Sequence, residues 1–375
     1  MIIKKHLSFK SKLFSSIDTV PAQLIPNYYP SVDGMRAIAV LMVTLAHFGF
    51  DMFPLPYGLS IESLMGVYIF FVLSGFLITT QLIKEKLTTG TISVKRFYIR
   101  RILRIIPLAY LFLFVLIIIS VCYGSMSSDS DFLISFLFIK NLPVKNHPFT
   151  AHLWTLSVEE QFYVILPLLI YLSLKKYFTI ALLLAVLIPF ISILSYHHIG
   201  FYCSNHIYLL VVKIIQYSFW KAPTIILIGS VFAILAFKGV NFHLPSKYYF
   251  LSFFLLLAAI LISTKNFIFY SKYISEFLSA IIIAYVILLN IYSNNFLTKV
   301  LSNPILIKIG ILSYSLYMWQ ELFLGRFFWI PWLKFLNTMP LLVIIFIKFI
   351  LLIPIAFISY RFIESPFLKW KAKYK

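Results

Sequence analysis

Long apolar runs separated by short polar segments fill almost the whole chain. Such runs are typical of membrane-spanning helices, which need about 20 predominantly apolar residues to cross a bilayer. The pattern predicts ten spanning helices, at residues 35–53, 64–83, 105–124, 152–172, 178–195, 219–237, 248–264, 274–293, 305–325 and 341–359. A shorter apolar run at 132–139 is expected to form a re-entrant or interfacial piece.

The composition supports this class. Hydrophobic residues make up 61% of the 375 residues, charged residues make up 12%, and the mean hydropathy is +0.95. A soluble domain has about 25% charged residues, so the sequence predicts an all-α polytopic membrane protein. We expect a basic N-terminal tail at 1–30, one transmembrane domain at 31–365 and a basic C-terminal tail at 366–375, with no separate soluble domain.

The distribution of Lys and Arg predicts the orientation. With both termini on the cytoplasmic side, 22 of the 32 Lys and Arg fall on inner segments and 8 on outer segments, as the positive-inside rule expects. The net charge of +20 is then explained by topology and contact with anionic lipid rather than by nucleic acid. The basic start MIIKKHLSFKSKLFSS lacks the apolar core of a signal peptide and is expected to be a cytoplasmic tail.

The first apolar segment, VDGMRAIAVLMVTLAHF at 32–48, contains three ionisable residues. On a helix, Arg36 and His47 lie about 20° and about 16 Å apart, and Asp33 continues their stripe. Ionisable residues inside a span are functional by default, so the stripe predicts a cation that holds an anionic group and an imidazole that moves protons. A structural alternative is a neutral His47 bonded to a neighbouring helix, with Arg36 as an interfacial anchor.

A basic cluster precedes the third span, in VKRFYIRRILRIIPL at 94–108. Arg100 and Arg104 are spaced i,i+4, and Arg101 and Arg104 i,i+3, so a helix is expected to gather the three guanidinium groups in one patch. The planar guanidinium fork suits bidentate binding of phosphate. The cluster therefore predicts a phosphate-rich cytoplasmic ligand, and the alternative is a lipid clamp or a charge cluster that only sets topology.

The segment HLWTLSVEEQFYVILPLL at 152–169 places two adjacent carboxylates, Glu159 and Glu160, inside an apolar run. Carboxylates are costly within a bilayer, and neighbours on a helix point about 100° apart, so one of the two is expected to join a polar cluster. Glu159 shares a helix face with His152 and Tyr163. The alternative is a structural salt bridge to an arginine of another helix.

Other polar residues give structural expectations. Arg361 and Glu364, spaced i,i+3 near the C-terminus, are expected to form a local ion pair. Cys122 and Cys203 both fall outside in the predicted topology, where they either pair as a disulfide or serve as small core residues. No standard metal-ligand spacing is formed by the loop histidines His197, His198 and His206.

Six blocks follow one another along the chain: DGMRAIAVLMVTLAHF, GVYIFFVLSGFLIT, RFYIRRILRIIPLAYL, HLWTLSVEEQFYVILPLL, GILSYSLYMWQELF and YRFIESPF. In order and content they resemble the acyltransferase 3 family of bacterial integral membrane O-acyltransferases, over about residues 30–370. The resemblance implies a ten-helix enzyme of the bacterial cytoplasmic membrane. Such an enzyme transfers an acyl group, commonly acetyl, from cytoplasmic acyl-CoA to a hydroxyl of a cell-surface or lipid-linked carbohydrate.

The resemblance also implies roles for single residues, with acyl-CoA as co-substrate and no bound cofactor or metal. His47 is expected to deprotonate the acceptor hydroxyl or to carry the acyl group, and Glu159 to orient the imidazole or hold an arginine. Binding of the CoA phosphates is expected from Arg36, Arg100, Arg101 and Arg104. Supporting roles are expected for Asp33, Glu160, Trp154, Ser157 and Lys221.

Three positions differ from the common family pattern. Tyr68 stands where many members have an acidic residue, Gln320 where many have His, and Lys221 near where many have Arg. Because Gln does not titrate, no proton relay is expected through Gln320. The soluble hydrolase-like domain that some longer members carry is expected to be absent, since the chain continues for only about ten residues past the last block.

Three other functions fit the same residues. The first is acylation of a small molecule or a lipid. The second is transport of an anionic metabolite past Arg36 and His47, which predicts substrate flux without a covalent product. The third is a membrane scaffold whose arginines only bind lipid, and it predicts that replacing His47 has no effect.

Overall fold

The computed structural model describes residues 15–52, 62–123, 129–142, 147–196, 223–240, 242–243, 245–264, 274–324, 335–336 and 338–374, and every regular element in these ranges is a helix. The α-helices are α2 (Pro30–His47), α3 (Ser63–Thr89), α4 (Val94–Tyr123), α5 (Asp129–Phe136), α6 (Pro148–Ala151), α7 (Leu153–Tyr196), α9 (Pro223–Phe237), α10 (Leu251–Ser263), α11 (Ile274–Tyr292), α12 (Phe296–Leu301), α13 (Pro304–Ile311), α14 (Ser313–Trp319), α15 (Leu341–Ser359) and α16 (Ser365–Lys371). The shorter elements are the 3-10 helices η1 (Ala22–Leu24), η2 (Phe50–Met52), η6 (Ser246–Tyr248), η7 (Gln320–Phe323) and η10 (Ala372–Tyr374), and the π-helix η9 (Tyr360–Glu364). The predicted all-α class is confirmed.

Five helical stretches in the described residues are long and apolar enough to cross a membrane: Ser63–Thr89, Val94–Cys122, Pro148–Ile191, Ile274–Tyr292 and Leu341–Tyr374. The helices Thr224–Phe237 and Leu251–Ser263 are apolar but shorter. Large apolar side chains on their outer surfaces are exposed, as lipid contact requires, and examples are Val121, Leu172 and Phe346. The chain is therefore a helical membrane protein, while the ten spans and the cytoplasmic termini remain predictions.

Two helix boundaries differ from the predicted spans in a way that matters for the chemistry. The first helix ends at His47 rather than at residue 53, because the chain turns at Gly49, whose φ of 102° is accessible mainly to glycine. The helix predicted from residue 105 begins at Val94 instead. The three arginines at 100, 101 and 104 therefore lie on a helix.

Other boundaries show where apolar periodicity alone was insufficient. The predicted spans 152–172 and 178–195 are the two arms of α7, which is interrupted at Ser173 by an extended backbone conformation. The predicted span 305–325 is broken into α13, α14 and η7 rather than forming one helix. The short run at 132–139 forms α5 and a following turn, as its length suggested.

The C-terminal end of α15 continues into η9, where the local geometry overturns one prediction. Glu364 is buried and accepts a hydrogen bond from the Ser315 hydroxyl, while Arg361 is exposed to the surroundings. A π-helix has more residues per turn than an α-helix, so positions i and i+3 no longer share a face. The predicted local ion pair between Arg361 and Glu364 is therefore wrong.

Close helix packing in the centre depends on glycines. A Cβ atom added at Gly75 in α3 would lie 2.0 Å from the carbonyl oxygen of Ile226 in α9. The contact is reciprocal, because a Cβ atom added at Gly229 would lie 2.1 Å from the carbonyl oxygen of Val72. Small residues let membrane helices approach backbone to backbone, so α3 and α9 form a tight pair.

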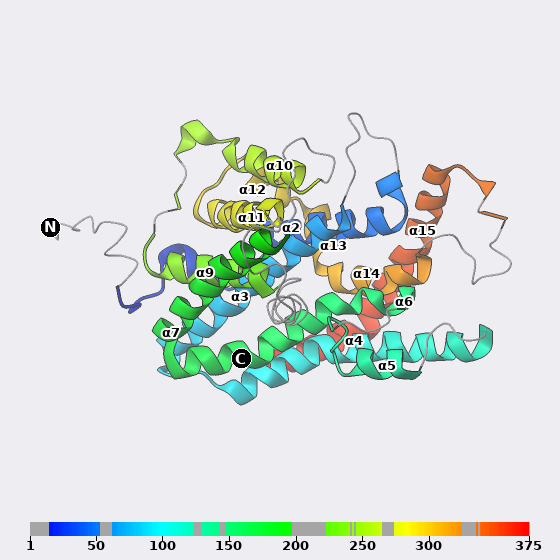
Figure 1. Ribbon diagram of the computed structural model, residues 1–375, viewed down its shortest axis with the longest axis horizontal. Coiled ribbons are helices and arrows are strands. Elements are labelled where there is room, and N and C mark those ends of the chain that lie inside the picture. The colour runs from blue at the N-terminus through cyan, green and yellow to red at the C-terminus, as the bar shows by residue number, and fades with distance from the viewer. Residues whose placement is uncertain are drawn as a thin grey trace.

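The helices are arranged so that several of them meet around one internal space. Figure 1 shows α2, α3 and α9 through the middle of the molecule, with α10, α11 and α12 on one side and α4, α5 and α7 on the other. Extensive contacts join α2 to α3 and to α13, and α16 packs against α4. The internal space is therefore bordered by α2, α3, α4, α7, α14 and α16.

Candidate active site

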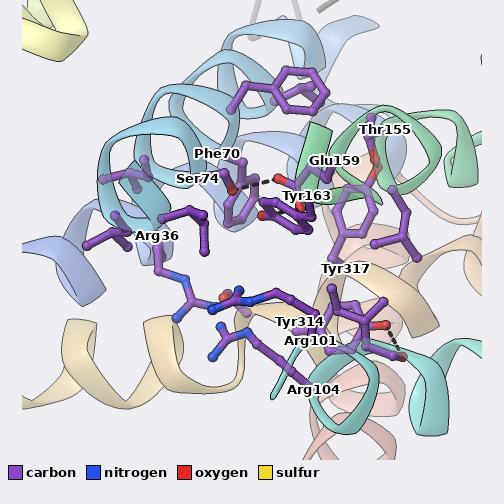
Figure 2. Close-up of a pocket in the computed structure, with 18 of the residues that line it drawn as sticks. Arg36, Phe70, Ser74, Arg101, Arg104, Thr155, Glu159, Tyr163, Tyr314 and Tyr317 are labelled. Atoms are coloured by element: carbon purple, nitrogen blue, oxygen red, sulfur yellow. Dashed lines mark hydrogen bonds between the residues drawn. The ribbon is translucent and has the colours of Figure 1, made fainter. Parts of the chain in front are cut away.

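A cavity of about 200 Å³ lies among α2, α3, α4, α7, α14 and α16. Its lining includes four cations, Arg36, Arg101, Arg104 and Lys371. In Figure 2 the guanidinium groups of Arg36, Arg101 and Arg104 gather on one side of this space, below Glu159 and its partners. Residues from the first helix and from the basic cluster thus contribute to one pocket.

The pocket cations have donor groups to spare. Nη1 of Arg36 lies 3.4 Å from the carboxylate of Asp33. Arg101 is buried between the rings of Phe97 and Tyr163, and its Nε atom has no hydrogen-bond partner in the residues that the structure describes. Within the described part of the chain, Arg104 forms no hydrogen bond or ion pair at all. Buried donors without partners are costly, so this pocket is suited to a strongly hydrogen-bonding anion.

Arg100 does not line this pocket. Its Nη2 atom pairs with the carboxylate of Glu85 at 3.0 Å, and its Nη1 atom donates to the backbone oxygen of Tyr374 at 2.8 Å. Neighbours on a helix point about 100° apart, which turns Arg100 away from Arg101. Of the three arginines predicted to form one patch, only Arg101 and Arg104 therefore face the pocket.

Glu159 lines the pocket opposite the arginines (Figure 2). It accepts hydrogen bonds from the Ser74 hydroxyl at 2.8 Å and from the Tyr163 hydroxyl at 3.2 Å. Glu160 points elsewhere, and its Oε1 atom is buried without a hydrogen-bond partner. Both polar partners of Glu159 are hydroxyl groups, and neither is His47.

A pair of hydroxyl groups forms one part of the pocket wall. Thr155 and Tyr317 lie 2.7 Å apart at their oxygen atoms, and both side chains line the cavity. The Tyr317 hydroxyl also donates to the backbone oxygen of His152 at 3.0 Å. Phe70, whose ring meets that of Tyr317 at 6.2 Å between centroids, completes this part of the wall.

A second group of ionisable residues lies behind this wall. Nδ1 of His47 is 3.0 Å from Oε1 of Glu321, a carboxylate with only 2% exposure in η7. Nδ1 of His152 lies 3.8 Å from the same oxygen, and the His152 ring meets that of Tyr317. The residue placed to orient the His47 imidazole is therefore Glu321, and the predicted alternative in which Glu159 does so is wrong.

The contact between His47 and Glu321 has a chemical consequence. Nδ1 lies within ion-pair distance of Oε1 of Glu321, but the two atoms do not meet hydrogen-bond geometry. A carboxylate beside Nδ1 attracts a proton to that nitrogen. His47 is the last residue of α2, which also carries Arg36. One helix thus connects the cationic pocket to an imidazole that lies beside a carboxylate.

The residues expected to support the site are placed differently from one another. Trp154 packs edge-on against Phe71, a pocket residue. Ser157 is buried outside the pocket, where its oxygen accepts a hydrogen bond from the backbone nitrogen of Lys140. Asp33 does not line the pocket itself, but its carboxylate contacts Arg36, which does.

For the other residues that the sequence analysis singled out, the structure gives burial or exposure, or does not describe the residue. Tyr68 is buried in the core, and the side-chain amide of Gln320 is buried without a hydrogen-bond partner among the described residues. Lys221, Cys203 and the histidines at 197, 198 and 206 lie outside the described residues. Cys122 is exposed, and its pairing with Cys203 stays a prediction.

Two pocket-side residues were missed by the sequence reasoning. Glu321 stands beside Gln320 in the apolar run 305–325, and the rule that flags intramembrane carboxylates applies to it as well as to Glu159. Lys371 was assigned to a basic tail. No local signal distinguishes it from Lys369 or Lys373, because its place depends on how α16 packs.

The chain is similar to known O-acetyltransferases. A family described as an acyltransferase domain matches residues 29–361. A Staphylococcus aureus MRSA252 protein named "Putative O-acetyltransferase" is 29% identical over 92% of this chain and 59% of its own length. The O-acetyltransferase OatA of Staphylococcus aureus NCTC 8325 is 27% identical over 92% of this chain and 58% of its own length.

A third relative is similar over a shorter region. The peptidoglycan O-acetyltransferase OatA of Listeria monocytogenes is 34% identical over 43% of this chain and 27% of its own length. This chain therefore spans less than two thirds of the curated relatives it matches. No solved structure matches it.

Proposed function

The chain belongs to the acyltransferase 3 family, and from this membership we propose that it is a membrane O-acetyltransferase acting on a carbohydrate of the cell envelope. The donor in this proposal is acyl-CoA, with acetyl-CoA the first candidate. One observation carries the proposal: α2 presents Arg36 to a cationic pocket and His47 to the carboxylate of Glu321. A binding site for a phosphorylated donor and an activated imidazole are thereby joined by one rigid element.

The donor is assigned to the pocket by its charge. Guanidinium groups bind phosphates through paired charge-assisted hydrogen bonds, and Arg36, Arg101 and Arg104 all face the cavity. The Nε atom of Arg101 and the whole guanidinium of Arg104 are without partners in the described residues. In the proposal the CoA phosphates satisfy these donors, and the thioester arm extends toward Thr155 and Tyr317.

The chemistry is assigned to His47. Its Nε2 atom takes the proton of the acceptor hydroxyl while the hydroxyl oxygen attacks the thioester carbonyl carbon. The new carbon–oxygen bond forms, the carbon–sulfur bond breaks, and the proton passes to the leaving CoA thiolate. In a second route Nε2 itself attacks the carbonyl carbon, the carbon–sulfur bond breaks and the CoA thiolate leaves. The acceptor hydroxyl then attacks the acyl-imidazole, the carbon–nitrogen bond breaks, and the hydroxyl proton passes to the CoA thiolate. Glu321 holds the imidazole for either route.

The acceptor is assigned by similarity. A relative named a peptidoglycan O-acetyltransferase and relatives named O-acetyltransferases support a cell-wall glycan. A lipid-linked saccharide offers the same hydroxyl chemistry. Acylation of a lipid or of a small molecule uses the same donor site, so only identification of the acylated product separates these acceptors.

The test uses purified full-length protein in nanodiscs, with radiolabelled acetyl-CoA and an envelope glycan extract. Transfer of label to glycan that is lost on His47→Ala supports the proposal. Tight CoA binding without label transfer to any glycan, lipid or small-molecule fraction would reject the enzymatic function. Uptake of an anionic metabolite into proteoliposomes, without a covalent product, would establish a transporter instead.

A further inference from the structure

The last segment of the chain forms part of the cationic pocket. After α15, the chain passes through η9 into α16 and η10. Lys371, the last residue of α16, lines the same cavity as Arg101 and Arg104. The predicted role of this segment was that of a cytoplasmic tail, yet its residue Lys371 lines the site.

Two contacts fix this segment to the rest of the molecule. At its start, Glu364 accepts a hydrogen bond from Ser315 of α14. At its end, the backbone oxygen of Tyr374 accepts a hydrogen bond of 2.8 Å from Arg100. Arg100 is in turn held by Glu85 of α3 at 3.0 Å. Lys371 lies between these anchors, so its position at the pocket is determined by both.

The surroundings of Lys371 are unusual for a lysine of a basic tail. In the described part of the chain its ammonium group makes no hydrogen bond or ion pair. The charges that act on it most strongly are Arg104, Arg101, Arg100 and Arg36, all of the same sign. Three of these arginines, Arg36, Arg101 and Arg104, line the cavity together with Lys371. Like charges around one small cavity repel one another, and a bound anion converts this repulsion into attraction.

We propose that Lys371 binds a phosphate group of the acyl-CoA donor, and that Arg100 is a positioning residue which holds the C-terminal segment over the pocket. This rests on the proposed function, because it names a further ligand of the same donor site. An ammonium group on a flexible stem acts as a point charge for phosphate. It complements the planar forks of Arg101 and Arg104, which line the same cavity.

The first test measures CoA binding to full-length protein in nanodiscs by titration calorimetry. Lys371→Ala is expected to raise the Kd for CoA about tenfold or more, and Lys371→Arg to restore much of the affinity. Lys369→Ala is the matched control, because Lys369 is exposed on the same helix and does not line the cavity. Equal Kd values for the two alanine variants would overturn the proposal.

A second probe tests whether phosphate is the group recognised. Pantetheine carries the thiol arm of CoA without any phosphate. Its affinity is expected to be the same for wild type and Lys371→Ala. A loss of pantetheine affinity equal to the loss of CoA affinity would show that the variant damages the pocket as a whole, and it would overturn the phosphate assignment.

The role of Arg100 is tested by a double-mutant cycle. If Arg100 acts by holding the segment that carries Lys371, Arg100→Ala raises the Kd for CoA, and it adds little once Lys371 is already alanine. Fully additive effects would show that Arg100 acts on the ligand independently and would overturn its positioning role. A matching melting temperature for all variants confirms that the fold is retained.

Arg104→Ala separates this inference from the proposed function. Wild-type binding that is weakened by Arg104→Ala but not by Lys371→Ala leaves the donor site intact and removes Lys371 from it. Folded wild-type protein that does not bind CoA at all overturns the donor assignment and, with it, the role of Lys371.

Discussion

His47 and Glu321 face each other at 3.0 Å between Nδ1 and Oε1, although the two residues come from the first described α-helix and from a short turn near the end of the chain. Each residue would be costly to bury alone within a membrane. Together they place a carboxylate beside an imidazole at the end of α2. The contact also shows how the two ends of the family domain are joined at the site.

Removing this pair should stop acyl transfer without removing donor binding. We expect His47→Ala to lower kcat by about 10²–10⁴-fold, the usual contribution of a general base. Glu321→Gln keeps the shape of the side chain and should lower kcat by about 10² or more, because the imidazole loses the carboxylate beside Nδ1. Single-turnover transfer of labelled acetyl measures both effects.

The control for this prediction is His243→Gln, which changes an exposed histidine away from the cavity. Its turnover should equal that of wild type. Normal kcat in Glu321→Gln would show that the observed contact has no part in the reaction.

The pocket arginines should govern affinity for the donor. Arg101→Ala and Arg104→Ala are each expected to raise the Kd for CoA by about tenfold or more, because a hydrogen bond to a charged group contributes about 1.5–3 kcal/mol. Arg96→Ala removes the same charge from an exposed position of α4 and should leave the Kd unchanged. Titration calorimetry at two salt concentrations checks this, since added salt should weaken the wild-type complex. Equal loss in all three variants would point to a general charge effect instead of a binding site.

The glycine contact between α3 and α9 should control stability. Gly75→Ala places a methyl group where the carbonyl oxygen of Ile226 already lies, so the helices must separate. We expect a loss of about 2 kcal/mol or more in the free energy of unfolding, at the level of other overpacked cores. Thermal unfolding in detergent, followed by tryptophan fluorescence, measures it.

A matched change on the outside of the bundle is Val186→Ala, at a side chain with 52% exposure. Its melting temperature should stay close to that of wild type. A Gly75→Ala protein as stable as this control would mean that the α3 and α9 backbones do not pack as closely as described.

The buried ion pair of Lys140 and Asp131 gives a fourth prediction. Asp131 also accepts a hydrogen bond from Thr150 at 2.5 Å, so it fixes α5 and the following turn to α6. Asp131→Asn leaves the Lys140 ammonium buried without its counter-charge and should cost about 3–5 kcal/mol.

The double variant Asp131→Leu with Lys140→Met removes both charges and should be more stable than either single variant. Equilibrium unfolding in a denaturing detergent ranks wild type, the single variants Asp131→Leu and Lys140→Met, and the double variant. Additive destabilisation in the double variant would contradict a direct interaction between the two side chains.

Much of the fold could be predicted from the sequence, because membrane helices are encoded by local apolar runs. The span predicted at 341–359 coincides with α15. The break of 305–325 into α13, α14 and η7 could not be predicted, since an apolar run has the same pattern whether or not its helix is interrupted. The kink at Ser173 was likewise hidden inside a long apolar pattern, although two predicted spans met near it.

Residues of the site could be predicted where helical periodicity alone determines the direction in which a side chain points. Arg101 and Arg104 share a face three residues apart and both reach the pocket. Arg100 was misassigned because its partner Glu85 belongs to another helix, and no spacing along α4 reveals that contact. Glu321 was overlooked for a similar reason, since its role arises only when η7 packs against the end of α2.

The π-helix Tyr360–Glu364 sets the rotational phase of everything that follows it. A π turn accommodates more residues than an α turn, so winding the same five residues as a regular α-helix would rotate α16 by about 100°. Ser315 would then lose its carboxylate partner, and Lys371 would turn away from the cavity. The wide backbone turn at this point therefore determines the position of Lys371 as strictly as residue identity does.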